Sequence, residues 1–205
     1  MAVVKKPARE LAFWKACRTA SRARLEKLLE DGADPIHGLP TFSPPLIAAA
    51  GSGRADVVEL LLERGAPLAE YGAGALVAAA GRTDADGKAI VARLLADGAL
   101  VLRSGKRSRG HATGATPLAI AVQGVQGALA GTRNVREARA ALTTLYRVVE
   151  RLLEAGADPS VPSVVNGRSL RPGEQLQELL DAWADHPAAA EARRRLSPRL
   201  SVDDV

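Results

Sequence analysis

The chain has 205 residues, 28 of them basic and 23 acidic, with a formal net charge of +5 and 47% hydrophobic residues, too many for a disordered chain. The single cysteine, Cys17, excludes an intramolecular disulfide framework and a multi-thiolate zinc site. No apolar run reaches the ~18 residues of a membrane span, and residues 1–17 lack the apolar segment of a secretory signal. We therefore expect a soluble protein in the reducing cytoplasm.

Residues 10–35 are predicted to form two helices, the second over 22–30, followed by the glycine of "LLEDGADP". A glycine just after the last apolar residue of a helix is typical of a left-handed C-cap. The first helix carries Phe13 and Trp14, and also Cys17, which we interpret as a small buried hydrophobe and not as a nucleophile.

The same ending recurs along the chain. "LLERGAPL" begins at Leu61, "LLADGALV" at Leu94 and "LLEAGADP" at Leu152, and the first three copies start 33 residues apart. A second motif precedes three of the copies, as "PLIAAAG", "ALVAAAG" and "PLAIAVQG". Two motifs at one period predict stacked helical hairpins, because one hairpin cannot bury its apolar stripe alone. The alanine triplets, which have little side-chain bulk, predict close packing between the first helices.

This period, with Pro-Leu opening a first helix and Leu-Leu-x-x-Gly-Ala closing a second, resembles the ankyrin repeat over roughly residues 10–160. The resemblance implies an all-α solenoid of helix-turn-helix repeats with projecting finger loops, forming one domain over residues 1–196. The expected parts are an N-terminal cap repeat over about 10–35, repeat 2 over 36–68, repeat 3 over 69–101, repeat 4 over 102–160, a degraded C-terminal cap over 161–196 and a flexible tail over 197–205.

The predicted fingers differ in length. The second, from Gly65 to Gly74, is three residues shorter than the usual spacing, and we place Glu70 and Tyr71 on it. The third, "ALVLRSGKRSRGHATGA", is six residues longer, contains no acid, and could form a short hairpin around Ser104-Gly105. It is interpreted either as a basic binding tip or as a solvated loop. Its basic residues are Arg103, Lys106, Arg107, Arg109 and His111.

The fourth repeat contains 19 residues beyond the family spacing. We expect a first helix prolonged towards Ala130, a turn at Gly131-Thr132, and a second helix from about Arg133 to Ala155, roughly 34 Å long. This long helical hairpin either packs on itself or grips a partner helix, and both can hold. Self-packing would join Val135, Ala138 and Leu142 to Val122, Val125 and Leu129.

The C-terminal stretch predicts two final helices over about 173–184 and 188–196, separated at Pro187. Their apolar stripe of Leu176, Leu179, Leu180 and Trp183 is typical of a closing cap.

We find no motif for catalysis or for a cofactor or metal. "SGKRS" lacks the upstream glycine and the hydroxyl of a phosphate loop. His37, His111 and His186 are too far apart in sequence for metal-ligand spacing, and "GRTDADG" lacks the distal acid of a calcium loop. Paired carboxylates on a concave face stay an open alternative.

The family resemblance implies a non-catalytic scaffold that binds another protein through its concave face, its fingers and the long helical hairpin. The surplus of positive charge favours an acidic partner. Phe42 and Tyr71, scarce aromatics expected on loops, are the predicted anchors. Concave positions carried over from the family are Arg18, Thr19, Gly51, Ser52, Gly81, Arg82, Gln123 and Gly124. The candidate partner-binding residues are His37, Phe42, Tyr71, Arg82, Arg103, Lys106, Arg107, Arg109, His111 and Gln123.

Two other classes of function are considered. The small-residue face of the second and third units favours a groove deep enough for an enzyme or small-molecule site. Nucleic-acid binding is disfavoured, because the acids are interspersed among the cations and aromatic stacking runs are missing. We expect no membrane partner.

Overall fold

The structure is a computed structural model that describes residues 5–37, 39, 41–82, 84–99, 116–131, 135–165, 168–182, 184 and 187–200. These residues form ten helices and two short strands. The helices are α1 (Lys5–Thr19), α2 (Arg22–Glu30), α3 (Pro45–Gly51), α4 (Ala55–Glu63), α5 (Leu68–Ala80), α6 (Ala85–Ala96), α7 (Pro117–Gly131), α8 (Val135–Glu154), α9 (Pro172–Ala182) and α10 (Pro187–Leu200). Within these described ranges, none of the helices combines the length and the apolarity that crossing a membrane requires.

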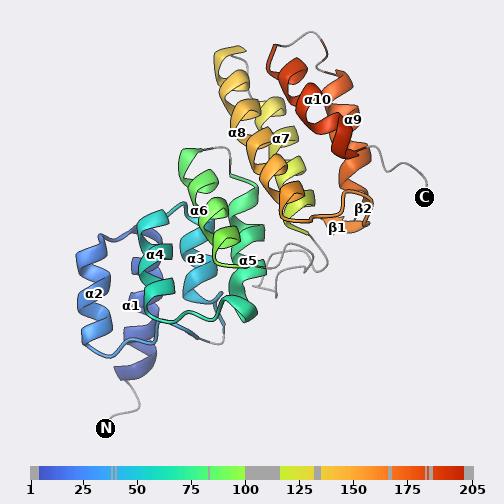
Figure 1. Ribbon diagram of the computed structural model, residues 1–205. Coiled ribbons are helices and arrows are strands. Elements are labelled where there is room, and N and C mark those ends of the chain that lie inside the picture. Colours follow the sequence, from blue (N-terminus) through green and yellow to red (C-terminus); the bar gives the residue numbers. More distant parts are fainter. Residues whose placement is uncertain are drawn as a thin grey trace.

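The helices stack as successive antiparallel pairs that follow one another from the N-terminus to the C-terminus (Figure 1). The first helices form one row, in which α1 contacts α3, α3 contacts α5, α5 contacts α7 and α7 contacts α9. The second helices form the other row, α2, α4, α6, α8 and α10, with the same neighbour-to-neighbour contacts. This arrangement confirms the predicted all-α solenoid of helical hairpins.

The recurring Leu-Leu-x-x-Gly-Ala motif builds an equivalent corner after four of the second helices. Its glycines, Gly32, Gly65, Gly98 and Gly156, have φ angles of +85°, +83°, +87° and +90°, a region that favours glycine. The N–H of the following alanine donates to the carbonyl of the first leucine, as from Ala66 to Leu61 at 3.0 Å. This six-residue hydrogen bond is a Schellman C-cap, and it turns the alanine into the core.

Small residues let the first helices approach one another closely. Ala49 of α3 and Ala75 and Ala79 of α5 are fully buried, and α3 contacts α5. Farther along, a Cβ atom added at Gly124 in α7 would lie 2.6 Å from the carbonyl oxygen of Gly81, so no larger residue fits this crossing. The predicted close stacking of first helices is therefore confirmed.

The prediction of a second finger loop that carries Glu70 and Tyr71 is wrong. The helix α5 begins at Leu68, so Glu70 and Tyr71 lie within the helix and not on a loop, and the Tyr71 side chain is only 7% exposed. The reason is the short connector after Gly65, which leaves no length for a projecting loop. Helical spacing of Leu68, Tyr71 and Ala75 then continues the apolar stripe of α5 towards its N-terminus.

The fourth hairpin is long, with 15 residues in α7 and 20 in α8. At 20 residues α8 is roughly 30 Å long, slightly less than expected. Val122 and Leu142 are buried, at 0% and 3% exposure. The side chains of their other predicted partners lie outside the described residues, so packing between them stays a prediction. Those partners are Val125, Leu129, Val135 and Ala138.

The C-terminal region forms a complete fifth hairpin. Its α9 packs on α7 and its α10 packs on α8, covering the row that the long α8 would otherwise leave open. The helix α10 continues to Leu200, so residues 197–200 are helical and do not belong to a tail as expected.

A β-hairpin that the sequence reasoning did not predict precedes this pair. Strand β1 (Ser163–Val165) pairs antiparallel with β2 (Arg168–Leu170), and Ser163 lies opposite Leu170. The Thr116 hydroxyl lies 2.9 Å from the Ser163 hydroxyl, which ties the hairpin to the start of α7. The predicted hairpin around Ser104-Gly105 falls outside the described residues.

Candidate binding groove

A groove of about 490 Å³ lies on the first-helix row between α1, the connector over residues 41–44 and α3, and it reaches α5. We call it the α1–α3 groove. Its lining residues Arg18, Phe42 and Gly51 are exposed, so the groove is open to solvent. The lining residues are Trp14, Arg18, Thr41, Phe42, Ser43, Ile47, Ala48, Gly51, Ser52 and Ala78.

Two aromatic rings form one wall of the groove. The Trp14 indole N–H donates to the Ser43 carbonyl at 3.0 Å, which fixes the connector against α1. The rings of Trp14 and Phe42 lie 4.6 Å apart between centroids, tilted by 45°. Phe42 nevertheless remains 37% exposed, which is unusual for a large apolar side chain in this protein.

The floor of the groove is made of small and aliphatic side chains. Ile47 and Ala48 of α3 are each 7% exposed, and Gly51 and Ala78 add almost no bulk where α3 meets α5. A larger residue at either position would fill the groove, so the alanine-rich pattern that allows close stacking also creates this concavity.

One cation stands at the rim. The Arg18 guanidinium lies 5.0 Å from the centre of the Trp14 ring, within cation–π range, and its Nε donates to the Ser52 hydroxyl at 3.3 Å. In the part of the chain that the structure describes, Arg18 forms no ion pair. Hydroxyls of Thr41, Ser43 and Ser52 complete the polar part of the lining.

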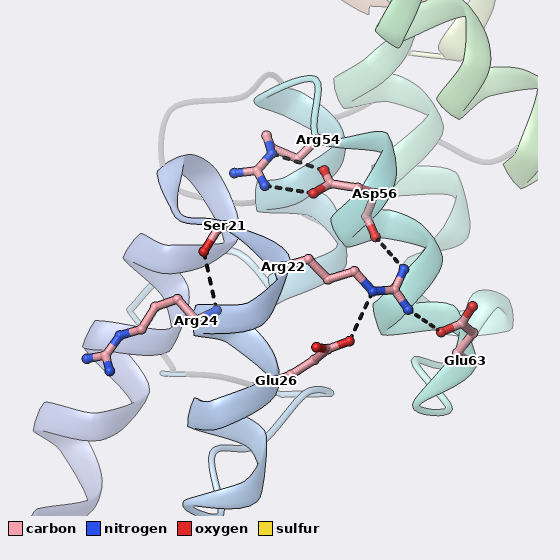
Figure 2. Close-up of polar contacts among 7 residues, drawn as sticks. All are labelled: Ser21, Arg22, Arg24, Glu26, Arg54, Asp56 and Glu63. Carbon is pink, nitrogen blue, oxygen red and sulfur yellow. Dashed lines mark hydrogen bonds and ion pairs between the residues drawn. The ribbon is translucent and has the colours of Figure 1, made fainter.

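On the second-helix row, Arg22 and Arg54 face carboxylates (Figure 2). Arg22 of α2 donates to Glu26 at 3.0 Å and to Glu63 of α4 at 2.8 Å, and so bridges two repeats. Arg54 makes a two-point contact with Asp56 at 3.1 and 2.9 Å, and this hydrogen bonding lowers the pKa of the Asp56 carboxyl below its ordinary value. Ion pairs this exposed to solvent contribute little to stability, because water and salt screen them.

A second cavity, of about 280 Å³, lies on that row between α6, α8 and α10. It mixes acids and bases: Arg195 contacts Glu191 at 2.7 Å and Glu150 at 3.7 Å. We interpret it as a solvated ion-pair network that braces the helices. Its lining residues are Lys88, Arg147, Glu150, Arg151, Glu154 and Arg195.

The structure brings together only some of the residues expected to face a partner. Phe42, Arg18, Gly51 and Ser52 meet in the groove. His37 is exposed but pairs with Asp34 outside it, Nδ1 to Oδ2 at 3.2 Å. The predicted contacts Arg103, Lys106, Arg107, Arg109 and His111 lie outside the described residues.

Three other residues that were expected to contact a partner do not line the groove. Arg82 donates to the Gly51 carbonyl at 3.0 Å and forms an ion pair with Asp84, so it braces the end of α3. Gln123 is partly exposed on α7 and does not line the groove. Tyr71 is buried in α5, which removes its expected exposure.

The sequence reasoning missed Trp14 as a wall of the groove. The sequence places Trp14 on the first helix of the N-terminal repeat and by itself does not indicate a contact with the following connector. The signal that could have found it was Phe42 one finger away, a second aromatic in a chain whose aromatics total 3%.

Reactive groups do not gather here. The Cys17 thiol is fully buried, and burial raises its pKa to about 12. Among the described residues no three His, Cys, Asp or Glu side chains are grouped in a way that could hold a metal ion.

Comparison with known proteins bears on the repeats themselves. The family model "Ankyrin repeat" matches residues 43–70, which cover α3, α4 and the start of α5. No curated protein matches the sequence. The matched hairpin has the same glycine corner as the hairpins that end with α2, α6 and α8. Residues 43–70 therefore resemble one ankyrin repeat, within a stack of similar helical pairs.

Proposed function

We propose that this protein is a non-catalytic interaction scaffold that holds an acidic protein partner on its first-helix row, with the α1–α3 groove as the main contact. Ankyrin repeats are protein-interaction modules. The observation that carries the proposal is the exposed Phe42 ring beside Arg18, which forms no ion pair with the described residues, above a floor of small side chains. Aromatic and arginine side chains dominate binding energy at protein interfaces. We also propose that the protein is located in the cytoplasm. Fractionation of its native cells would test this location.

The proposed contact set changes from the one expected from sequence. His37 and Gln123 stay in it because each is at least partly exposed. Tyr71 and Arg82 leave it, because the first is buried and the second braces α3. The basic residues of the third finger stay in it on their sequence alone.

The test is affinity capture on the immobilised full-length chain from native-cell lysate, followed by calorimetry with the purified partner. The Phe42→Ser variant should lose the partner, while His186→Ser, which changes an aromatic ring far along the chain, should retain it. A partner bound equally well by the Phe42→Ser protein would contradict use of the groove. Reversal of Lys106, Arg107 and Arg109 to Glu tests the finger separately, with weaker binding expected.

A small-molecule site is the second candidate, because a volume of about 490 Å³ falls within the range of ligand pockets. Its open rim argues against it, since such pockets enclose most of their ligand. A thermal shift of the chain with a metabolite panel, abolished by Phe42→Ser, would favour this alternative over a protein partner.

A further inference from the structure

The charge at the rim of the α1–α3 groove is of one sign. Arg18 is the single charged residue among those that line the groove, and the lining contains no carboxylate. On the second-helix row, by contrast, Arg22 and Arg54 face carboxylates that already neutralise them (Figure 2). The groove therefore presents a net positive charge to whatever enters it.

The Arg18 guanidinium is held in place with most of its hydrogen-bonding capacity unused. The Trp14 face and the Ser52 hydroxyl fix it, and only Nε donates. Within the described residues, neither terminal nitrogen of Arg18 has a protein acceptor. A guanidinium has five N–H donors in a planar fork that matches the two oxygens of a carboxylate.

Directly beside this cation lies a space that suits an apolar side chain. Phe42 and Trp14 bound it on one side, and the small residues Gly51 and Ala78 leave room for a side chain at its floor. The groove is larger than a single side chain and lies open at the surface, so an extended segment can lie along it with one residue pointing down. A cation next to an apolar depression favours a segment that carries both complementary groups.

We infer that the α1–α3 groove binds an extended acidic peptide segment of the partner, with an apolar side chain on the Gly51–Ala78 floor and a neighbouring carboxylate on Arg18. The inference rests on the proposed function and specifies the chemistry of its ligand. The carboxylate accepts from the terminal nitrogens of Arg18, and the apolar residue covers the exposed ring of Phe42.

The first experiment is selection from a phage-displayed library of random linear dodecapeptides on the full-length chain. Enriched sequences should share a large aliphatic or aromatic residue within two positions of Asp or Glu. The most enriched peptide, synthesised with a fluorophore, is then titrated by anisotropy against the protein and its variants.

Charge variants test the role of Arg18 with a matched control. Arg18→Glu should weaken binding about tenfold or more, since it removes charge-assisted hydrogen bonds to the carboxylate and places a like charge beside it. Arg24→Glu makes the same charge change on α2, where the side chain points away from the neighbouring ion pairs, and should change affinity less than about twofold (Figure 2). Equal urea midpoints of the variants would show that both remain folded.

A third variant tests the floor. Gly51→Ala places a methyl group 3.5 Å from the Ala78 Cβ, an ordinary contact that the fold tolerates in the last turn of α3. It should weaken peptides with a large apolar residue and shift the library preference towards smaller ones. A loss of packing alone would not change which peptides are selected.

Three results would overturn the inference: no enrichment, enrichment of basic sequences, or equal losses for Arg18→Glu and Arg24→Glu. If one of them occurs while lysate capture still depends on Phe42, the scaffold proposal stands and only the peptide chemistry is wrong. If the chain also captures no partner, both proposals fail.

Discussion

At the scale of single residues, glycine plays two opposite roles in this chain. Gly65 has a φ of +83° at a helix corner, whereas Gly127 lies inside α7, and an added Cβ meets nothing within 4 Å at either place. Gly65→Ala should therefore lower the free energy of unfolding by about 1 kcal/mol through backbone strain alone. Gly127→Ala should raise it by about 0.5–1 kcal/mol, because alanine is the better helix former. Urea titration measures both free energies of unfolding, and changes of the same sign in the two variants would contradict the opposite roles of these glycines.

Cys17 gives a pH-dependent prediction. Its thiol stays protonated in the fold, with a pKa near 12 against 9.0 for the ordinary group. The folded pKa is raised, so the stabilisation is present below pH 9 and is lost as pH rises towards 12. Between these values the unfolding free energy of the parent chain should fall by about 1.4 kcal/mol per pH unit relative to Cys17→Ala, because only the unfolded thiol ionises. Parallel pH curves for the two proteins would refute a buried neutral thiol.

At the scale of elements, the α9–α10 pair closes the stack. Leu196 of α10 is fully buried, and α10 packs on both α8 and α9. Leu196→Ala should cost about 2–5 kcal/mol. Because the described helices pack mainly against those of the adjacent pairs, faster hydrogen exchange should appear in α7 to α10 and leave α1 to α4 unchanged. Exposed Arg194→Ala on the same helix is the control, and uniform loss of protection along the chain would show a single cooperative unit instead.

At the scale of the whole molecule, the solenoid is a chain of neighbouring interfaces. Leu76 of α5 is fully buried in the third pair, whose first helix contacts both α3 and α7. Leu76→Ala should weaken the packing of the third pair against both of its neighbouring pairs, and should lower the free energy of unfolding by about 2–5 kcal/mol in total. The two tryptophans, Trp14 and Trp183, lie near opposite ends of the sequence and can report each half separately.

The measurement uses urea unfolding followed by fluorescence in Trp14→Phe and Trp183→Phe backgrounds. Without the core change the two midpoints should coincide, and with Leu76→Ala they should separate. Coincident midpoints in the core variant would indicate that long-range cooperativity is stronger than nearest-neighbour contacts provide.

The repeat architecture could be predicted from sequence because its signals are local and periodic. A Schellman corner needs glycine and a following small residue at fixed offsets, and the chain supplies them after α2, α4, α6 and α8. The β-hairpin before α9 also had a local signal, the Asn-Gly pair between β1 and β2, which favours a two-residue turn. The resemblance to a degraded C-terminal cap over 161–196 does not imply a strand there, so the repeat pattern by itself does not predict this hairpin.

The groove could be predicted only in part. Arg18, Gly51 and Ser52 follow from their register in the repeats, and Phe42 follows from its place on a loop. Trp14 does not, because its contact with Phe42 joins different repeats and depends on how the connector folds back. Tyr71 shows the opposite error: the short connector after Gly65 already argues against a projecting finger, and α5 begins at Leu68, ahead of Tyr71.

The hydrogen bond from the Trp14 indole to the Ser43 carbonyl has a consequence for rates. The aromatic wall is already assembled in the free protein, so an arriving molecule has to give up only its own conformational freedom. Encounter should then be governed by diffusion and orientation, with no slow rearrangement of the scaffold. Partners that differ in affinity should differ chiefly in their dissociation rates.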